Sequence, residues 1–190
     1  MLRRWMAGRA ADYLPGAGNY LGVNALKDRK LLEFQHIIQI NDPQEQRIPH
    51  LSRIQLWEGL VFRTKYPGHF NATLSARLVD VSPTGFIRYL NFGTAELRDE
   101  VVLLEGEEIR TSTAGVVQHM FAESVTRIEE PAPGHLFVRF QYRRDSVNEP
   151  GGLDVDEYLK AAYVQNDRDA IARLREFAAN GLPGTGSWVQ

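Results

Sequence analysis

The longest regular pattern of apolar positions lies near the C-terminus, over residues 154–180. Apolar side chains recur there every three or four residues, which is the spacing of one face of an α-helix. The stripe consists of Val155, Leu159, Ala162, Tyr163, Ala170, Leu174 and Phe177. An acidic capping box, Asp154 with Glu157, marks one end, and Gly181 and Pro183 mark the other. The pattern predicts a long helix, and the residues expected to lie away from its stripe are Asp156, Lys160, Asp167 and Arg175.

Two polar residues, Asn166 and Arg173, fall within the apolar arc of this helix. One explanation is a buried amide with hydrogen-bond partners and an arginine whose charged end reaches the solvent. The other is that the helix covers a partly open cavity and that both groups point into it.

Most of the chain before this helix alternates between apolar and polar residues, a pattern typical of β-strands. Turn-forming residues recur at intervals of about a dozen residues, as in an antiparallel meander. The expected strands cover residues 33–41, 73–82, 86–92, 95–104, 108–113, 117–130 and 135–144.

Two short helices are expected between the first and second strands. Ser52 and Gln55 form a capping box that opens the first. Its inner face is predicted to contain Ile54, Trp57, Leu60, Val61 and Thr64. Residues 67–72 are expected to form a second short helix or a turn that brings Phe70 to the core.

Strand register places charged residues on the face intended for burial. A two-residue turn at Gly93-Thr94 pairs Arg88 with Asp99. A three-residue loop over residues 83–85, with Gly85 in the left-handed conformation, would place Asp80 on the other side of Arg88. Such buried charges must be paired. This triad is therefore either a structural brace or the group that orients the polar end of a ligand.

Alternation also places His36 on the apolar face of the first strand, beside Phe34 and Ile38. A histidine there is either a hydrogen-bonded core residue or a ligand or base. Small and aromatic residues alternate on the inner faces of the last two strands, and they either leave a cavity or interdigitate into a filled core.

Composition narrows the classes of function. The 190 residues are 43% hydrophobic with a formal charge of -2, so we expect one domain with its own core and no nucleic-acid partner. The chain has no cysteine, which excludes thiol catalysis and favours a cytoplasmic location. No apolar run approaches the ~18 residues that span a bilayer, so no stable membrane insertion is expected.

Residues 1–32 are expected to form an N-terminal extension, because the stretch YLPGAGNYLG at 13–22 has neither a helical nor a strand period. A short helix over residues 3–14 is expected within it. The extension packs on the domain or on a neighbouring subunit of a homodimer, or is an over-long translation start. The domain is expected over residues 33–181 and a tail over residues 182–190.

Four segments carry a resemblance to a known family: FQHIIQIND at 34–42, LWEGLVFR at 56–63, RIEEPAPGHLFVRFQY at 127–142 and DEYLKAAY at 156–163. They resemble the AtaL-like family of the START and Bet v1-like (SRPBCC) superfamily. The resemblance implies an α+β helix-grip fold, in which a curved antiparallel sheet of seven strands wraps around the long C-terminal helix. It also implies a cavity for a small hydrophobic ligand, but it brings no catalytic motif.

Two functions of different class follow. The first is noncatalytic binding of a small hydrophobic molecule such as a lipid, a polyketide or an aromatic metabolite. The alternative is a polyketide cyclase- or dehydratase-like enzyme that uses acid–base residues, with His36 and Asp99 as the main candidates. A third hypothesis is a subunit-interaction module that uses residues 1–32.

The sequence contains no phosphate-binding loop, histidine pair or nucleophile elbow, so no metal or cofactor is expected. The residues expected to contact the ligand are His36, Trp57, Phe70, Leu78, Arg88, Leu90, Phe92, Asp99, Met120, Phe140, Tyr142, Leu159, Tyr163 and Asn166.

Overall fold

A computed structural model describes residues 30–45, 47–114, 121–146 and 154–183. The chain divides into a unit of residues 1–30 and a unit of residues 31–190, and all the elements below belong to the second. The predicted N-terminal extension before residue 30, the tail from residue 184 and Met120 lie outside the described residues.

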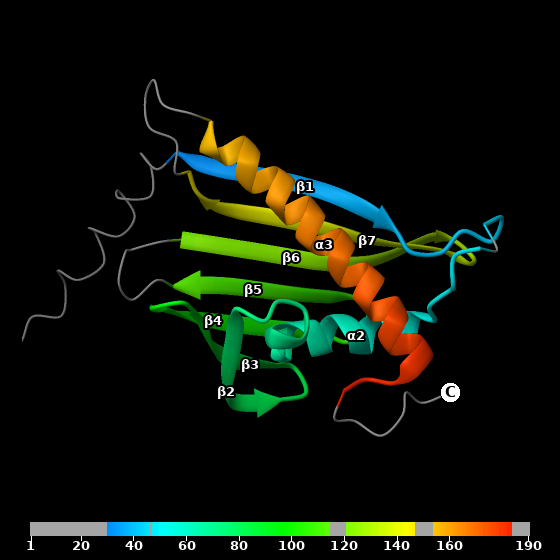
Figure 1. The fold of residues 1–190 in the computed structure, drawn as a ribbon, viewed down its shortest axis with the longest axis horizontal. Coiled ribbons are helices and arrows are strands. Elements are labelled where there is room, and N and C mark those ends of the chain that lie inside the picture. Colours follow the sequence, from blue (N-terminus) through cyan, green and yellow to red (C-terminus); the bar gives the residue numbers. More distant parts are fainter. Residues whose placement is uncertain (1–29, 46, 115–120, 147–153, 184–190) are drawn as a thin grey trace, which may run out of the picture. The chain divides into compact units, whose positions relative to one another are not determined.

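One antiparallel sheet, in the order β1-β7-β6-β5-β4-β3-β2, forms a curved layer crossed on one face by the long helix α3 (Figure 1). This arrangement confirms the predicted α+β class. The strands are β1 (Leu31–Gln39), β2 (Leu74–Ser82), β3 (Gly85–Phe92), β4 (Ala95–Leu104), β5 (Glu108–Ala114), β6 (Phe121–Ala132) and β7 (His135–Asp145). The helices are α2 (Arg53–Lys65), the 3-10 turn η1 (Pro67–His69) and α3 (Val155–Asn180).

Helix α2 begins as predicted, because Ser52 and Gln55 form the full capping box. Its predicted inner face is wrong in one respect, since Ile54 is 63% exposed while Leu56 is buried. Gly59 explains the rotation: a Cβ atom there would lie 2.7 Å from Cδ2 of Leu174 on α3. The side of α2 that carries this glycine therefore turns toward α3.

Helix α3 buries Ala170, Leu174 and Phe177 as expected, but the rest of its predicted stripe is partly wrong. Asp156 and Asp167, expected outside, are 7% and 0% exposed, whereas Val155 and Ala162 are exposed. Buried carboxylates are tolerated when they are hydrogen-bonded. Ser146 donates to Asp156 at 2.5 Å, and the Asp167 partners are described below.

The β3–β4 register is as predicted, with Arg88 opposite Asp99. The predicted β2–β3 loop is wrong: Ser82 pairs with Gly85, so the turn has two residues, and a bulge between Val79 and Ser82 precedes it in β2. Asp80 lies in that bulge with φ 53° and is exposed, so it does not contact Arg88. Gly85 is the first residue of β3 instead of a loop residue, and the position requires glycine because a Cβ atom there would lie 2.3 Å from the Val101 carbonyl oxygen. The expected triad is therefore a pair.

Candidate functional site

A partly open cavity of about 300 Å³ lies between the inner face of the sheet, the C-terminal half of α2, η1 and α3. One part of its wall is apolar, from Leu60, Pro67, Phe70, Leu74, Leu90 and Ile109. The rest is polar, from Arg63, Thr64, Asn71, Arg88, Thr111, Ser124, Thr126, Tyr142, Tyr163 and Asn166. The lining thus contains more polar residues than apolar ones, although the family resemblance implies a cavity for a small hydrophobic ligand.

Sheet register arranges the hydroxyl groups of this wall in neighbouring positions. Thr111 pairs with Ser124, and Ser124 pairs with Tyr142, so these residues form one row across β5, β6 and β7. Paired residues on one face of a sheet lie about 5 Å apart. Among the described residues, none forms a hydrogen bond with the side chains of Thr111, Ser124 or Thr126. These three hydroxyls are available to a molecule in the cavity.

Asp167 of α3 is the centre of a buried polar network behind the cavity wall. Its Oδ2 atom accepts a hydrogen bond from the Tyr142 hydroxyl at 2.6 Å and lies 2.8 Å from Nε2 of His36. Its Oδ1 atom accepts from Nη2 of Arg63 at 2.8 Å. The network therefore joins β1, β7 and α2 to α3, and Arg63 and Tyr142 connect it to the cavity.

Tyr142 remains protonated in this environment. Burial, together with the Asp167 carboxylate, raises the pKa of the Tyr142 phenol well above its ordinary value. The ring stacks on Tyr163, with 4.3 Å between ring centroids. Tyr142 is thus a fixed hydroxyl group rather than a base.

Arg88 and Asp99 form a second network on the inner face. Nε and Nη2 of Arg88 donate to Oδ2 of Asp99 at 2.8 and 2.6 Å, and Thr113 donates to Oδ1 at 2.6 Å. Nη1 of Arg88 donates to the Thr64 carbonyl in the last turn of α2 at 2.7 Å. The pair therefore holds the end of α2 against the sheet and places Arg88 in the cavity wall.

The residues predicted to contact a ligand fall into three groups in the structure. Those that line the cavity are Phe70, Arg88, Leu90, Tyr142, Tyr163 and Asn166. Those that lie behind the wall or in the core are His36, Trp57, Leu78, Asp99 and Phe140. Phe92 is 58% exposed and Leu159 half-buried, and neither lines the cavity.

Sequence reasoning missed Arg63, Thr111, Ser124, Thr126 and Asp167. Of the two polar residues in the α3 arc, only Asn166 faces the cavity, whereas Arg173 is exposed and bonds Glu176 at 2.6 Å. The spacing of Asp167, four residues from both Tyr163 and Ile171, is the pattern that could have found it.

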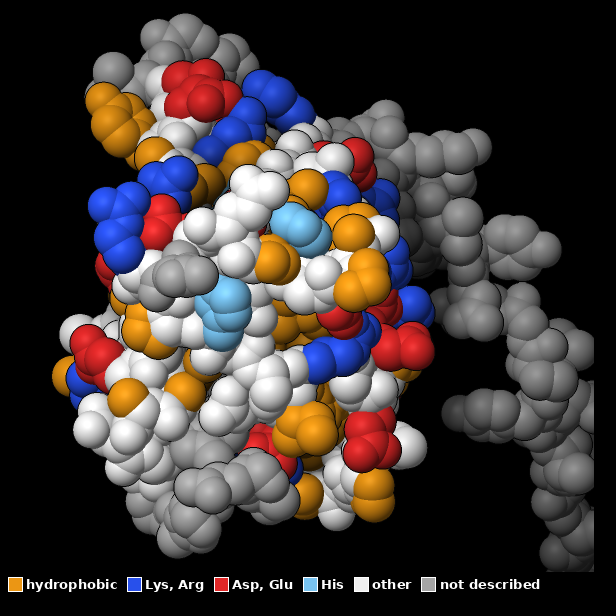
Figure 2. Space-filling view, turned by 90° about the vertical axis from the view of Figure 1, so that its right-hand side faces the viewer, with side chains coloured by type: hydrophobic (Ala, Val, Ile, Leu, Met, Phe, Trp, Pro, Cys, Tyr) orange, Lys and Arg blue, Asp and Glu red, His pale blue; other side chains and the backbone are white. Residues whose placement is uncertain are grey.

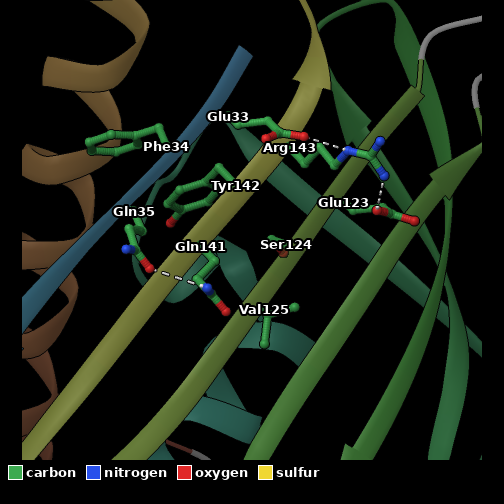
Figure 3. A pocket seen from close by; sticks show the side chains of 9 residues that line it. All are labelled: Glu33, Phe34, Gln35, Glu123, Ser124, Val125, Gln141, Tyr142 and Arg143. Atoms are coloured by element: carbon green, nitrogen blue, oxygen red, sulfur yellow. Dashed lines mark hydrogen bonds and ion pairs between the residues drawn. The ribbon is translucent and has the colours of Figure 1, made fainter. Parts of the chain in front are cut away.

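A larger, shallow hollow of about 560 Å³ lies on the outer face of β1, β7 and β6 (Figure 3). Most of its polar side chains form hydrogen bonds or ion pairs with one another. Arg143 donates to Glu33 at 3.0 Å and lies 3.6 Å from Glu123, and Gln141 donates to Gln35 at 3.2 Å. Because these groups are paired and open to solvent, we place the functional site in the inner cavity.

The surface in Figure 2 carries acidic, basic and hydrophobic side chains intermixed, without one dominant charge on that face. Within the described ranges, no cluster of three or more histidine, aspartate or glutamate residues could hold a metal ion. Of the helices described, none combines the length and the hydrophobicity of a bilayer-spanning segment.

The sequence model of one family, described as acetylaranotin biosynthesis cluster protein L (AtaL), matches residues 38–181. A comparison with curated proteins gives no match. The match confirms the AtaL-like resemblance that the sequence suggests.

Several solved structures share the fold. The di-domain aromatase/cyclase StfQ of the steffimycin pathway has a TM-score of 0.61 at 12% identity, over 79% of this chain and 51% of that one. The chain thus spans about half of StfQ. Norcoclaurine synthase from Thalictrum flavum, in complex with dopamine and hydroxybenzaldehyde, gives 0.56 at 13% identity, over 87% and 96%. The Streptomyces aromatase/cyclase Zhui gives 0.54 at 12% identity, over 82% and 100%. At these identities the likeness shows the helix-grip fold alone.

Proposed function

The chain belongs to the AtaL family, and from its cavity we propose that it binds a small molecule with a hydrophobic frame between the sheet and α3, without catalysing a reaction. The observation that carries this proposal is a set of three hydroxyl groups on β5 and β6 that face the cavity. They belong to Thr111, Ser124 and Thr126, and none has a hydrogen-bond partner among the described residues. A volume of about 300 Å³ lies at the lower end of the range for ligand pockets, roughly 300–1,000 Å³. A compact ligand of two or three fused rings suits this space.

A substitution that fills the cavity tests the proposal. Ser124→Leu places a larger side chain in the middle of the hydroxyl row. We expect it to weaken binding of the uncharged fluorescent probe 1-aminoanthracene by about tenfold or more, because overpacking costs about 1–3 kcal/mol. Fluorescence titration measures the affinity, and native mass spectrometry of the purified protein would detect a molecule that copurifies.

The matched control is Ser112→Leu, the same substitution on the outer face of β5, where the side chain is exposed. It should leave the affinity unchanged. Unaltered binding by a folded Ser124→Leu protein would mean that the probe does not occupy this cavity.

A cyclase- or dehydratase-like activity is the second candidate function, and the Asp167 network favours it. Arg63 could polarise a substrate carbonyl, while Tyr142, Asp167 and His36 form a hydrogen-bonded acid–base series at the cavity wall. Asp99 is 1% exposed and fully engaged by Arg88 and Thr113, so in this scheme it positions Arg88.

Turnover of a poly-β-ketone substrate, followed by liquid chromatography, tests this alternative. Activity should be lost in Tyr142→Phe while far-ultraviolet circular dichroism stays unchanged. If the wild-type protein binds the substrate but does not convert it, the catalytic alternative is wrong and the noncatalytic function stands. A cytoplasmic location and a homodimer remain predictions.

A further inference from the structure

Among the described residues, side chains of only one charge sign line the cavity. The guanidinium groups of Arg63 and Arg88 are part of this lining, and none of the described carboxylates is. The two carboxylates that pair with them, Asp167 and Asp99, are 0% and 1% exposed and lie behind the wall. Each arginine is therefore neutralised from the side away from the cavity.

Both arginines nevertheless keep hydrogen-bond donors for a ligand. A guanidinium carries five N–H groups. Arg63 uses one of them, toward Asp167. Arg88 uses three, two toward Asp99 and one toward the Thr64 carbonyl. The remaining N–H groups have no partner among the described residues. With the free hydroxyls of the wall, they form a surface that donates to oxygen acceptors.

The same pairing disfavours an anionic ligand. The two arginines and two aspartates have a formal charge sum of zero, so a carboxylate in the cavity would meet no unpaired arginine or lysine among the described lining residues. Burying an uncompensated carboxylate costs several kcal/mol, whereas a carbonyl or hydroxyl oxygen needs only hydrogen bonds.

We propose, on the basis of the binding function above, that the ligand is an uncharged molecule with carbonyl or hydroxyl oxygens on an apolar frame. The oxygens bond Arg63, Arg88 and the hydroxyl row, and the frame packs on Phe70, Leu74 and Leu90. The site thus discriminates against carboxylic acids, including fatty acids.

A pair of isosteric competitors tests this inference. 6-Methoxy-2-naphthamide and 6-methoxy-2-naphthoate have nearly the same shape, and only the second is charged. Each competes with 1-aminoanthracene at pH 8, above the range in which histidine ordinarily binds a proton. We expect the wild-type protein to bind the carboxamide at least about tenfold more tightly than the carboxylate, because the carboxylate meets no free cation.

Removing a paired carboxylate should shift this preference. Asp99→Asn and Asp167→Asn each leave one arginine unpaired, and each should improve carboxylate binding relative to carboxamide binding by about tenfold. Glu33→Gln changes the net charge equally on the outer face, where Glu33 pairs with Arg143, and should leave the ratio unchanged. The ratio of carboxamide to carboxylate affinity in the wild-type protein is a test by itself, so the inference can be tested even if Asp99→Asn or Asp167→Asn misfolds.

The outcomes separate the two proposals. If 1-aminoanthracene does not bind, the binding function fails and this inference fails with it. If the probe binds and the carboxylate displaces it as well as the carboxamide or better, only the inference about ligand charge is overturned.

Discussion

The Asp167 carboxylate is fully buried and stabilised by three side chains. Its two oxygens accept from Tyr142 and Arg63 and lie beside the imidazole of His36, so it is fully buried without being unpaired. A buried charge that loses its partner is destabilising by about 3–5 kcal/mol. These side chains therefore hold one another in place, and Arg63 and Tyr142 keep fixed positions in the cavity wall.

Tyr142→Phe should weaken this network in a pH-dependent way. Near neutral pH we expect a loss of about 1.5–3 kcal/mol, typical of a hydrogen bond to a charged group. The pKa of Tyr142 is raised in the folded protein, so its contribution is complete below pH about 10, the ordinary value, and falls as pH rises above it. Urea unfolding from pH 8 to pH 11 should show wild-type stability falling more steeply than that of the variant. Parallel curves would contradict the assignment.

Glu108 should give the opposite pH dependence. Burial alone would raise its pKa, but hydrogen bonds from Arg110 and Arg127 outweigh burial and hold the pKa below the ordinary value of 4.5. The stabilisation is therefore present above pH 4.5 and is lost as pH falls below it. Thermal unfolding between pH 6 and pH 3 should show a steeper loss in the wild type than in Glu108→Gln. Glu105→Gln, at an exposed position, is the control and should follow the wild type.

Sequence reasoning located one charged network and missed the other for a physical reason. Arg88 and Asp99 lie on adjacent strands that a two-residue turn joins, so counting residues from the turn is enough to pair them. Asp167 meets His36, Arg63 and Tyr142 only when α3 packs on the sheet, and no local pattern contains those distances. The spacing of Asp167 from Tyr163 and Ile171 could indicate that it lies on the same face of the helix as they do, but not which residues it contacts.

At the scale of elements, the contact between α2 and α3 depends on the missing side chain of Gly59. A Cβ atom would lie 2.7 Å from Cδ2 of Leu174, which is fully buried and has little room to move. The helices can therefore approach closely enough to close the cavity beside their contact.

Gly59→Ala should test that contact, because its effect on the free energy of unfolding should change sign between two backgrounds. In the wild-type background we expect a loss of about 1–2 kcal/mol from overpacking. With Leu174→Ala also present the clash is gone, and the higher helix propensity of alanine should make the same substitution stabilising by up to about 1 kcal/mol. Urea denaturation of the four proteins in this double-mutant cycle measures both effects. Additive changes would show that the two residues do not interact.

The elements themselves were predicted more reliably than the faces they bury. Alternation and turn residues placed all seven strands, because both are local properties of the chain. The face of α2 was misplaced because Leu56 and Phe62 extend its apolar surface beyond one stripe. The β2–β3 register failed because Gly85 serves close strand packing rather than the turn.

For the whole molecule, the order of strand, short helices, meander and long helix predicts the α+β class, and the resemblance of four segments to the AtaL-like family implied the helix-grip fold. The cavity followed from the fold, but its polarity did not, since that depends on which residues face inward. The AtaL match begins at residue 38, and the sheet begins at Leu31.

Deletion of residues 1–30 should therefore leave the midpoint of thermal unfolding and the affinity for 1-aminoanthracene unchanged. Light scattering of both forms measures the oligomeric state. A smaller assembly after deletion would support the subunit-interaction hypothesis for this segment.

Neighbouring residues of β6 line two different pockets: Glu123 and Val125 line the outer hollow but not the cavity, Thr126 lines the cavity but not the hollow, and Ser124 lines both (Figure 3). Inserting a single residue ahead of Ser124, with the preceding residues held in register, would turn Ser124 and Thr126 to the outer face and bring Val125 to the inner face. Point changes at Val125 or Thr126 can thus alter one pocket separately, whereas a one-residue insertion or deletion would alter both. We expect sequence drift in this strand to proceed by replacement, with length changes confined to its ends.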